Sequence, residues 1–210
     1  METRKLSKRL DAVAGFVPKG ARLVDVGSDH AYLPLFLVEQ GWIDFAIAGE
    51  VVQGPYQSAL TNVAEAGLTD HIQVRLADGL AAVVAEDKIS AVTIAGMGGR
   101  LIADILAAGR DKLDGVTDLI LQPNNREDEL RSWLSENDFA IMDERILTES
   151  GKTYEILVVR SGQQTLSDLE VRFGPFLMRE QSPVFVAKWE KELVKLQAAL
   201  AKIPESNEDD

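Results

Sequence analysis

The sequence of 210 residues contains no cysteine and only two histidines. The absence of cysteine excludes disulfide bonds, thiol catalysis and zinc–thiolate sites, and two histidines are too few for a histidine-rich metal site. No stretch approaches the roughly 18 apolar residues of a membrane span, and the first residues open no long apolar run. These absences predict a cytoplasmic protein with no metal and no membrane partner.

Positive charge is also scarce, because 22 lysines and arginines stand against 34 aspartates and glutamates, for a net charge of −12. Such a balance argues against a nucleic-acid partner. Net charge is an average, however, and an acidic protein can bind RNA through a local patch. The first ten residues hold four bases, Arg4, Lys5, Lys8 and Arg9. A solvated helix face and a phosphate-binding patch both explain them.

Apolar runs alternate with helical patterns over the first three quarters of the chain. The predicted strands are residues 22–26, 45–49, 72–76, 89–95 and 117–121, and the helices between and after them are residues 31–38, 54–66, 100–108 and 127–136. This alternation predicts right-handed βαβ crossovers and a mostly parallel sheet. Two further β segments, 139–147 and 154–160, are joined by a short polar turn, which predicts an antiparallel hairpin at the sheet edge.

The composition changes after residue 162, where no further strand-like run occurs. We therefore divide the chain into residues 1–162 and residues 163–210. Residues 166–179 look helical with a break at Gly174-Pro175, and Ser182-Pro183 is a good helix start. The seam of this last helix has heptad spacing, at Trp189, Leu193, Leu196, Leu200 and Ile203. It predicts an antiparallel helical hairpin with residues 166–179.

The turn at residues 27–31 follows the first strand and precedes an apolar helix, as in nucleotide-binding α/β domains. It has one glycine where a dinucleotide fingerprint needs three, and no Gly-Lys-Ser/Thr follows, which excludes a P-loop. Asp25 and Asp29 would repel a pyrophosphate. They suit a ligand that carries a sulfonium and an ammonium group, and the turn therefore predicts S-adenosylmethionine (SAM).

Two more strand ends agree with this cofactor. Glu50 follows the second strand, where a carboxylate can accept hydrogen bonds from both ribose hydroxyls. Asp78-Gly79 follows the third strand, where a carboxylate can accept a hydrogen bond from the exocyclic amine of adenine. The ends of consecutive parallel strands converge on one crevice. The fourth strand ends in Ala95-Gly96-Met97-Gly98-Gly99, whose glycines allow a flat group close to the backbone; a tight strand–helix turn is the alternative explanation.

These motifs resemble those of the bacterial TrmK family, tRNA (adenine-N1)-methyltransferases that act on the adenine at tRNA position 22. The motifs are Gly-Ser-Asp-His-Ala-Tyr-Leu-Pro at 27–34, Gly49-Glu50-Val51-Val52, Gly54-Pro55-Tyr56-Gln57-Ser58-Ala59, Ala77-Asp78-Gly79, Ile94 to Gly99, Gln122-Pro123-Asn124, Phe173 to Leu177 and Ser182 to Phe185. The resemblance covers residues 5–203. It implies an α/β fold, with a Rossmann-like class I SAM-dependent methyltransferase sheet and a C-terminal coiled-coil hairpin.

The resemblance also implies a set of site residues. The residues expected to hold SAM are Asp25, Gly27, Ser28, Asp29, Glu50, Val51, Asp78, Gly79, Ala95, Gly96, Met97 and Gly98. Asp29 and His30 would face the reaction centre, although His30 could instead fix the turn. The residues expected to contact tRNA are Arg4, Lys5, Lys8, Arg9, Tyr32, Asn124, Lys188, Lys191 and Lys195. Solvation is the alternative explanation for the lysines, and core packing for Tyr32 or Met97 as a base-stacking group.

Two other functions remain open from the residues alone. The acidic charge favours a methyltransferase for a small molecule or a protein, and a non-catalytic module could use the SAM pocket as a sensor. The sequence leaves the oligomeric state open.

Overall fold

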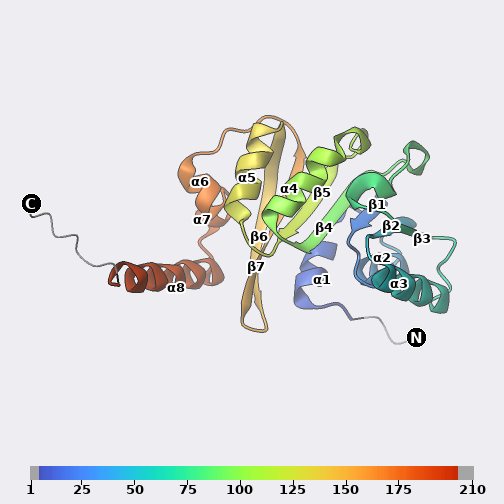
Figure 1. The fold of residues 1–210 in the computed structure, drawn as a ribbon, viewed down its shortest axis with the longest axis horizontal. Helices are drawn as coiled ribbons and strands as arrows, with labels where there is room; N and C mark the ends of the chain where they lie inside the picture. The colour runs from blue at the N-terminus through green and yellow to red at the C-terminus, as the bar shows by residue number, and fades with distance from the viewer. Residues whose placement is uncertain (1–4, 203–210) are drawn as a thin grey trace, which may run out of the picture.

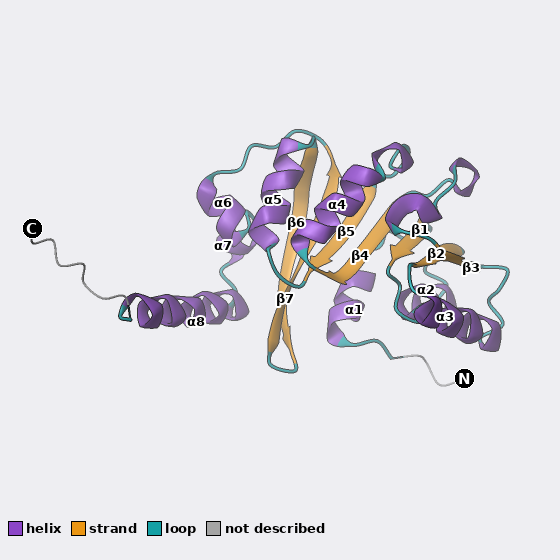
Figure 2. Ribbon diagram, viewed as in Figure 1, coloured by secondary structure: helices purple, strands orange, loops and turns teal. Residues whose placement is uncertain are grey.

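The computed structural model describes residues 5–202, and the predicted RNA contact Arg4 lies outside this range. A seven-stranded sheet forms the centre of the molecule, with helices on both faces (Figures 1 and 2). The strands are β1 (Arg22–Val26), β2 (Phe45–Glu50), β3 (Ile72–Leu76), β4 (Ala91–Met97), β5 (Asp118–Pro123), β6 (Phe139–Glu149) and β7 (Lys152–Ser161). The α-helices are α1 (Lys8–Ala14), α2 (Tyr32–Glu39), α3 (Gln53–Glu65), α4 (Gly99–Ala108), α5 (Glu127–Glu136), α6 (Asp168–Phe173), α7 (Leu177–Glu180) and α8 (Pro183–Leu200). Three short 3₁₀ helices are η1 (Gly79–Ala82), η2 (Ala85–Asp87) and η3 (Arg110–Lys112).

The strand order is β3-β2-β1-β4-β5-β7-β6. The first five are parallel, and β7 and β6 form an antiparallel hairpin on β5. The predicted Rossmann-like α/β fold is therefore confirmed. The sequence predicted the hairpin at the edge but not which of its strands lies inside; β7 pairs with β5, and β6 becomes the edge strand.

The two faces of the sheet are covered by different helices, as the alternation of strand side chains requires. Val24 and Ile47 face α4 and α5, whereas their neighbours Leu23 and Ala46 face α1, α2 and α3. The strands β1, β2, β4 and β5 are thus buried on both sides along most of their length, which explains why they read as apolar runs rather than as alternating ones. The edge strand β3 is only partly buried, and its sequence alternates.

The strand order reverses between β1 and β4, which pair directly. In open α/β sheets the crevice outside the carboxyl ends at such a point is where ligands bind. All of the turns that the sequence singled out, after β1, β2, β3, β4 and β5, lie at this edge.

The C-terminal helices differ from the predicted hairpin. Gly174 ends α6, and α7 has only four residues, so no long helix is available to pair with α8. Phe173 of α6 meets Trp189 at 4.6 Å between ring centroids. Farther along the seam, Leu193, Leu196 and Leu200 are 55%, 56% and 65% exposed, and α8 projects from the body (Figure 1). Among the described residues, the predicted pairing forms only at its first turns.

A buried ionic network attaches these helices to the sheet. The fully buried Arg131 of α5 donates to Glu144 of β6 at 2.8 Å and to Glu155 of β7 at 2.5 Å. Glu144 also accepts the backbone N–H of Phe176 at 2.9 Å, and Lys188 of α8 donates to Glu155 at 2.6 Å. Loss of one partner would leave a buried charge uncompensated, at a cost of about 3–5 kcal/mol.

Gly174 allows the chain to pass over this network. It has a φ of 84°, and an added Cβ would lie 2.7 Å from Arg131 Nη2 and 2.7 Å from Glu144 Oε2. Left-handed strain costs an ordinary residue about 1–2 kcal/mol, and overpacking adds about 1–3 kcal/mol.

We expect Gly174→Ala to lower the free energy of unfolding by about 2–5 kcal/mol in urea titrations. The matched control is Gly151→Ala, because Gly151 has a φ of 75° and no atom within 4 Å of an added Cβ. It should show the backbone strain alone. Equal losses in the two variants would contradict the assigned role of the network.

Candidate functional site

The turn after β1 has an unusual backbone. Asp29, His30 and Ala31 have φ values of 45°, 68° and 60°, so three consecutive residues other than glycine are left-handed. Each such residue costs of order 1–3 kcal/mol and persists only where the surrounding structure holds it. Strain of this size at the end of β1 marks the turn as a functional candidate.

Groups from β2 and α3 hold the turn in place. The Gly49 carbonyl accepts the N–H groups of Gly27 and Ser28 at 2.9 and 3.1 Å. The Asn62 side-chain amide of α3 donates to the His30 carbonyl at 3.0 Å. Asn62 was not predictable from the sequence, because a lone asparagine inside a helix gives no signal of a partner 32 residues away.

Glu50 lies behind this turn and is only 5% exposed. Burial raises the pKa of its carboxyl group, and hydrogen bonds from the backbone N–H groups of Asp29 and His30 oppose the rise. Its Oε1 atom is buried and has no hydrogen-bond partner among the described residues. A buried polar atom without a partner is costly, so this oxygen is suited to accept a hydrogen bond from a ligand.

Asp25 is buried at the junction of β1 and β4. Its carboxylate accepts the hydroxyl groups of Ser28 and Thr93, both at 2.6 Å. Burial raises the pKa of Asp25 to about 6; the two hydroxyl groups lower it, Glu50 raises it further and Arg9 lowers it. A cationic ligand nearby would favour the ionised form.

Gly27 and Met97 meet across the crevice. Gly27 has a φ of 66°, and an added Cβ would overlap the Met97 Cε. Any side chain at position 27 would therefore fill the space between the ends of β1 and β4. The close approach of the two turns forms one wall of a hollow that a flat or narrow group can enter.

The predicted cofactor residues are distributed around two hollows. A cavity of about 310 Å³ is lined by seven of them, Asp25, Gly27, Ser28, Asp29, Ala95, Gly96 and Met97. A second cavity of about 450 Å³ is lined by Asp78 and Gly79 and by one side of α4. Glu50 and Val51 line neither cavity, and Val51 is 62% exposed. Gly98 precedes α4 and ends the β4 turn.

A polar network that the sequence did not reveal closes the smaller cavity. The buried Gln122 Oε1 accepts Arg9 Nη1 at 2.6 Å and the Gly96 N–H at 3.0 Å, and Gln122 Nε2 donates to Asn124 Oδ1 at 3.1 Å. The Arg9 guanidinium lies 5.6 Å from the centre of the Tyr154 ring. Tyr154 comes from β7, far away in sequence. The sequence had singled out Arg9, Gly96 and Asn124 for other contacts, but it gave no signal for Tyr154 or for the hydrogen bonds that join these residues.

The predicted reaction-centre residues lie at the mouth of the site. The Asp29 side chain is 80% exposed and its Oδ1 lies 3.4 Å from His30 Nε2. The His30 and Tyr32 rings are 5.4 Å apart. Lys5 and Lys8 are exposed beside α1, whereas Lys188, Lys191 and Lys195 lie across the hairpin from this cavity, around another hollow. Within residues 5–202 no three metal-binding side chains cluster, and no helix is long and apolar enough to cross a membrane.

Comparisons with a family model, with curated proteins and with solved structures all point to the same family. The model of the family described as "TrmK: tRNA (adenine(22)-N(1))-methyltransferase" matches residues 23–210. The tRNA (adenine(22)-N(1))-methyltransferase of Bacillus subtilis is 45% identical over 98% of this chain and 89% of its own length. The crystal structure of B. subtilis TrmK has a TM-score of 0.91 at 44% identity, over 99% of this chain and 91% of that one.

Two further similar structures contain a ligand. Streptococcus pneumoniae Sp1610 in complex with S-adenosyl-L-methionine is 64% identical, with a TM-score of 0.91 over 93% of this chain and 91% of that one. M. capricolum TrmK in complex with S-adenosyl-homocysteine (SAH) is 30% identical, with a TM-score of 0.86 over 96% of this chain and 90% of that one.

The raised pKa of Asp25 predicts a pH dependence of stability. The folded value of about 6 exceeds the ordinary value of 3.8, so between these pH values the folded state binds more protons than the unfolded state. The free energy of unfolding must then fall as pH rises from 4 to above 6, by about 2–3 kcal/mol from this group. Asp25→Asn should lack this fall.

Chemical unfolding at pH 4.5, 6 and 7.5 checks the prediction. The stability of Asp25→Asn relative to wild type should increase with pH, and Asp70→Asn, at an exposed position, is measured beside it as the control. A constant difference for Asp25→Asn would contradict the assignment.

Proposed function

The chain belongs to the TrmK family of tRNA (adenine(22)-N(1))-methyltransferases, and from this premise we propose which of its residues bind the cofactor, meet the adenine and bind the tRNA. Membership makes it a SAM-dependent enzyme that methylates N1 of adenine 22 in tRNA. The observation that carries the residue assignment is the unpartnered, buried Glu50 Oε1 at the end of β2.

The acidic strand ends fit SAM residue by residue. We assign Glu50 Oε1 to the ribose hydroxyls, because a carboxylate at this strand end can accept them. Asp78, after β3, is assigned to the exocyclic amine of adenine. Asp25, with Gly27 and Ser28, is assigned to the amino-acid end of the cofactor, because a buried carboxylate balances the positive charge there. Val51 and the Gly96–Gly98 turn would line the two sides of the adenosine.

When bound, SAM supplies an electrophilic methyl group on a positively charged sulfur. Adenine N1 carries an in-plane lone pair, so no general base is needed. The protein must instead expose N1 and hold it in line with the methyl group, and such alignment can be worth roughly 7–11 kcal/mol of barrier. Extraction of the nucleotide from its stack costs a few kcal/mol.

Asp29 is our first candidate for stabilising the positive charge that moves onto the base. It lines the cavity that Asp25 and Met97 also line. Its side chain is exposed at the mouth of this cavity, where a carboxylate can accept a hydrogen bond from the exocyclic amine of the substrate adenine. His30, 3.4 Å from Asp29, is assigned as its hydrogen-bond partner. Tyr32 and Met97 are candidates for stacking on the extracted base, and Asn124 for a polar contact to it.

We further propose that residues 163–210 act as an RNA-binding part attached to the catalytic sheet. Their support is the basic side of α8, which carries Lys188, Lys191 and Lys195. Lys5, Lys8 and Arg9 would extend the RNA contact on the other side of the hairpin. Of the three, Arg9 is the least available to RNA, because its guanidinium already donates a hydrogen bond to Gln122. Because tRNA is a cytoplasmic substrate, we place the enzyme in the cytoplasm.

Incubation of the protein with an unmodified tRNA transcript and methyl-labelled SAM tests the function. Label should appear at N1 of adenine 22, where it blocks reverse transcription, and a transcript with guanine at position 22 should stay unlabelled. Label elsewhere, or none on tRNA, would overturn the proposal.

Asp29→Asn tests the role of the carboxylate in the same assay. Asparagine tolerates a positive φ, so this change removes the charge and keeps the turn. We expect the turnover number to fall about 100-fold while SAH affinity stays within about twofold. Asp70→Asn is the matched control, and a turnover number for Asp29→Asn equal to that of wild type would remove Asp29 from the mechanism.

A further inference from the structure

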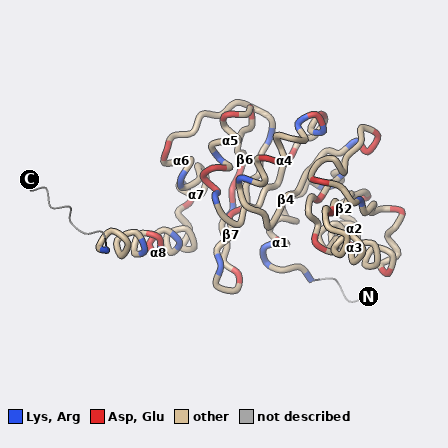
Figure 3. The backbone as a smooth tube through the Cα atoms, viewed as in Figure 1, with Lys and Arg blue, Asp and Glu red and all other residues tan. Residues whose placement is uncertain are grey.

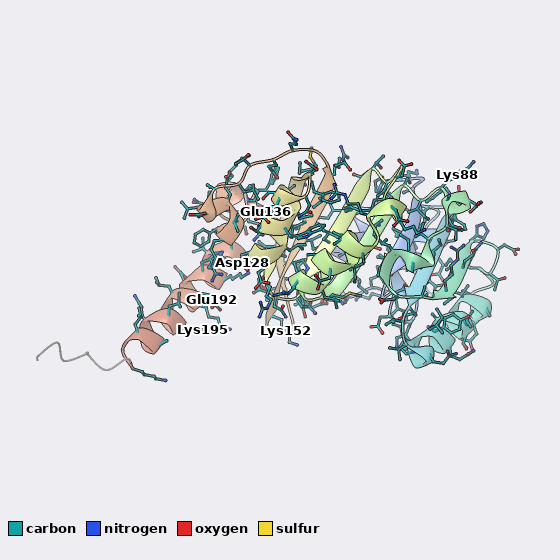
Figure 4. All side chains as sticks on the ribbon, turned by 45° about the horizontal axis from the view of Figure 1, so that its top comes forward. Lys88, Asp128, Glu136, Lys152, Glu192 and Lys195 are labelled. Carbon is teal, nitrogen blue, oxygen red and sulfur yellow. The ribbon has the colours of Figure 1, made fainter. Side chains whose placement is uncertain are left out.

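A larger hollow lies next to the site, and the three α8 lysines that we propose to bind RNA lie on one side of it. It is a cavity of about 580 Å³. Its walls come from four parts of the chain: the loop from Asn124 into the start of α5, the β6–β7 turn, Arg172 of α6, and one side of α8. Figure 4 shows four labelled members from these elements, Asp128, Lys152, Glu192 and Lys195, on the same side of the molecule.

Basic side chains outnumber acidic ones around this cavity, in a chain whose net charge is −12. Five of its lining residues are basic, Lys152, Arg172, Lys188, Lys191 and Lys195, and three are acidic, Glu127, Asp128 and Glu192. Figure 3 marks the basic positions on both α8 and the hairpin. A local surplus of positive charge in an acidic protein is the electrostatic signature of a site for an anionic ligand.

The acidic residues are already paired. Arg172 donates to Asp128 at 2.6 Å, Lys188 to Glu127 at 3.1 Å and Lys195 to Glu192 at 2.6 Å. Within residues 5–202, neither Lys152 nor Lys191 forms an ion pair. These two side chains are exposed, come from opposite walls and are free to bind phosphate.

Two residues are shared between this cavity and the smaller one at the strand ends. Asn124 and Tyr154 line both. Asn124 is held by its amide, which donates to the Gly96 carbonyl at 2.8 Å, and Tyr154 lies under Arg9. The two cavities therefore meet at Asn124 and Tyr154. An RNA strand whose target base lies in the smaller cavity could continue from there into the larger one.

Aromatic side chains line the same cavity. Tyr154 and Trp189 are both half-buried on its walls, and Trp189 Nε1 is buried with no acceptor among the described residues. Positive charge interleaved with planar side chains is how proteins bind single-stranded nucleic acid, by phosphate contacts and base stacking.

We propose that this cavity binds the nucleotides that flank the target adenine, with backbone phosphates on Lys152 and Lys191 and a neighbouring base against Tyr154 or Trp189. The assignment rests on the proposed function, since it requires an extracted adenine in the smaller cavity. It explains why the β6–β7 hairpin and α8 are tied together through Glu155. The hairpin and the helix supply opposite walls of one RNA channel.

The charge-removing variant Lys152→Gln/Lys191→Gln tests the proposal. We expect tRNA to bind at least 10-fold more weakly at 100 mM salt, and the slope of log K against log[salt] to become shallower by about one for each lysine. SAH affinity should not change. The matched control is Lys19→Gln/Lys88→Gln, which removes the same charge at exposed positions outside the cavity; Lys88 lies at the far end of the molecule (Figure 4).

A second variant should change the affinity for tRNA in the opposite direction. Glu192→Gln releases Lys195 from its ion pair, so tRNA binding should tighten by about two- to fivefold and its salt slope should steepen. Wild-type affinity and slope in both cavity variants, with tRNA still methylated by the wild-type protein, would overturn this proposal alone. Absence of methylation by the wild-type protein would instead overturn the proposed function.

Discussion

The rest of the site depends on the carboxylate of Glu50, which is buried at the end of β2. Burial raises the pKa of this carboxyl group and the backbone N–H groups of Asp29 and His30 oppose the rise, so the side chain lies close to the turn of three consecutive left-handed residues. The Oε1 atom is buried without a partner. The same side chain thus lies behind the turn that carries Asp29 and offers the acceptor that we propose for the ribose. Occupation of Oε1 would remove an unsatisfied buried acceptor and make the strained turn less costly to maintain.

The antiparallel hairpin connects the proposed cofactor site to the proposed RNA-binding surface. Register places Tyr154 of β7 opposite Leu147, close to the start of α1 and to Arg9. Farther along the same strand, Glu155 is buried and binds both Arg131 and Lys188. One strand therefore helps to close the smaller cavity and fixes the helix that we propose to bind the flanking nucleotides. A displacement of α8 would alter both walls of the proposed channel.

The strand ends were predictable from the sequence because their chemistry is local. A short apolar run followed by an acid or a glycine places that residue at the edge of a parallel sheet, and this led to Asp25, Gly27, Glu50 and Asp78. The partners of long side chains were not predictable. Arg9 was expected to contact RNA, and the structure places its guanidinium on Gln122, 113 residues away.

The C-terminal part shows the same limit. The heptad spacing correctly predicted a helix over α8, and the Gly174-Pro175 break correctly divided the preceding helix. The spacing could not show that the remaining pieces are too short to cover Leu196 and Leu200. Nor could it show that Arg131, which reads as a surface residue of an acidic helix, is fully buried between two glutamates. Both outcomes depend on contacts between elements distant in sequence.

The most direct test of this account is the affinity of Glu50→Gln for SAH, measured by calorimetry beside its free energy of unfolding. Glutamine can still accept one backbone N–H, but it cannot offer a charged acceptor to the ribose. A charge-assisted hydrogen bond contributes about 1.5–3 kcal/mol, so the account predicts a 10- to 100-fold loss of affinity in a folded variant. Wild-type affinity for SAH in Glu50→Gln would contradict it.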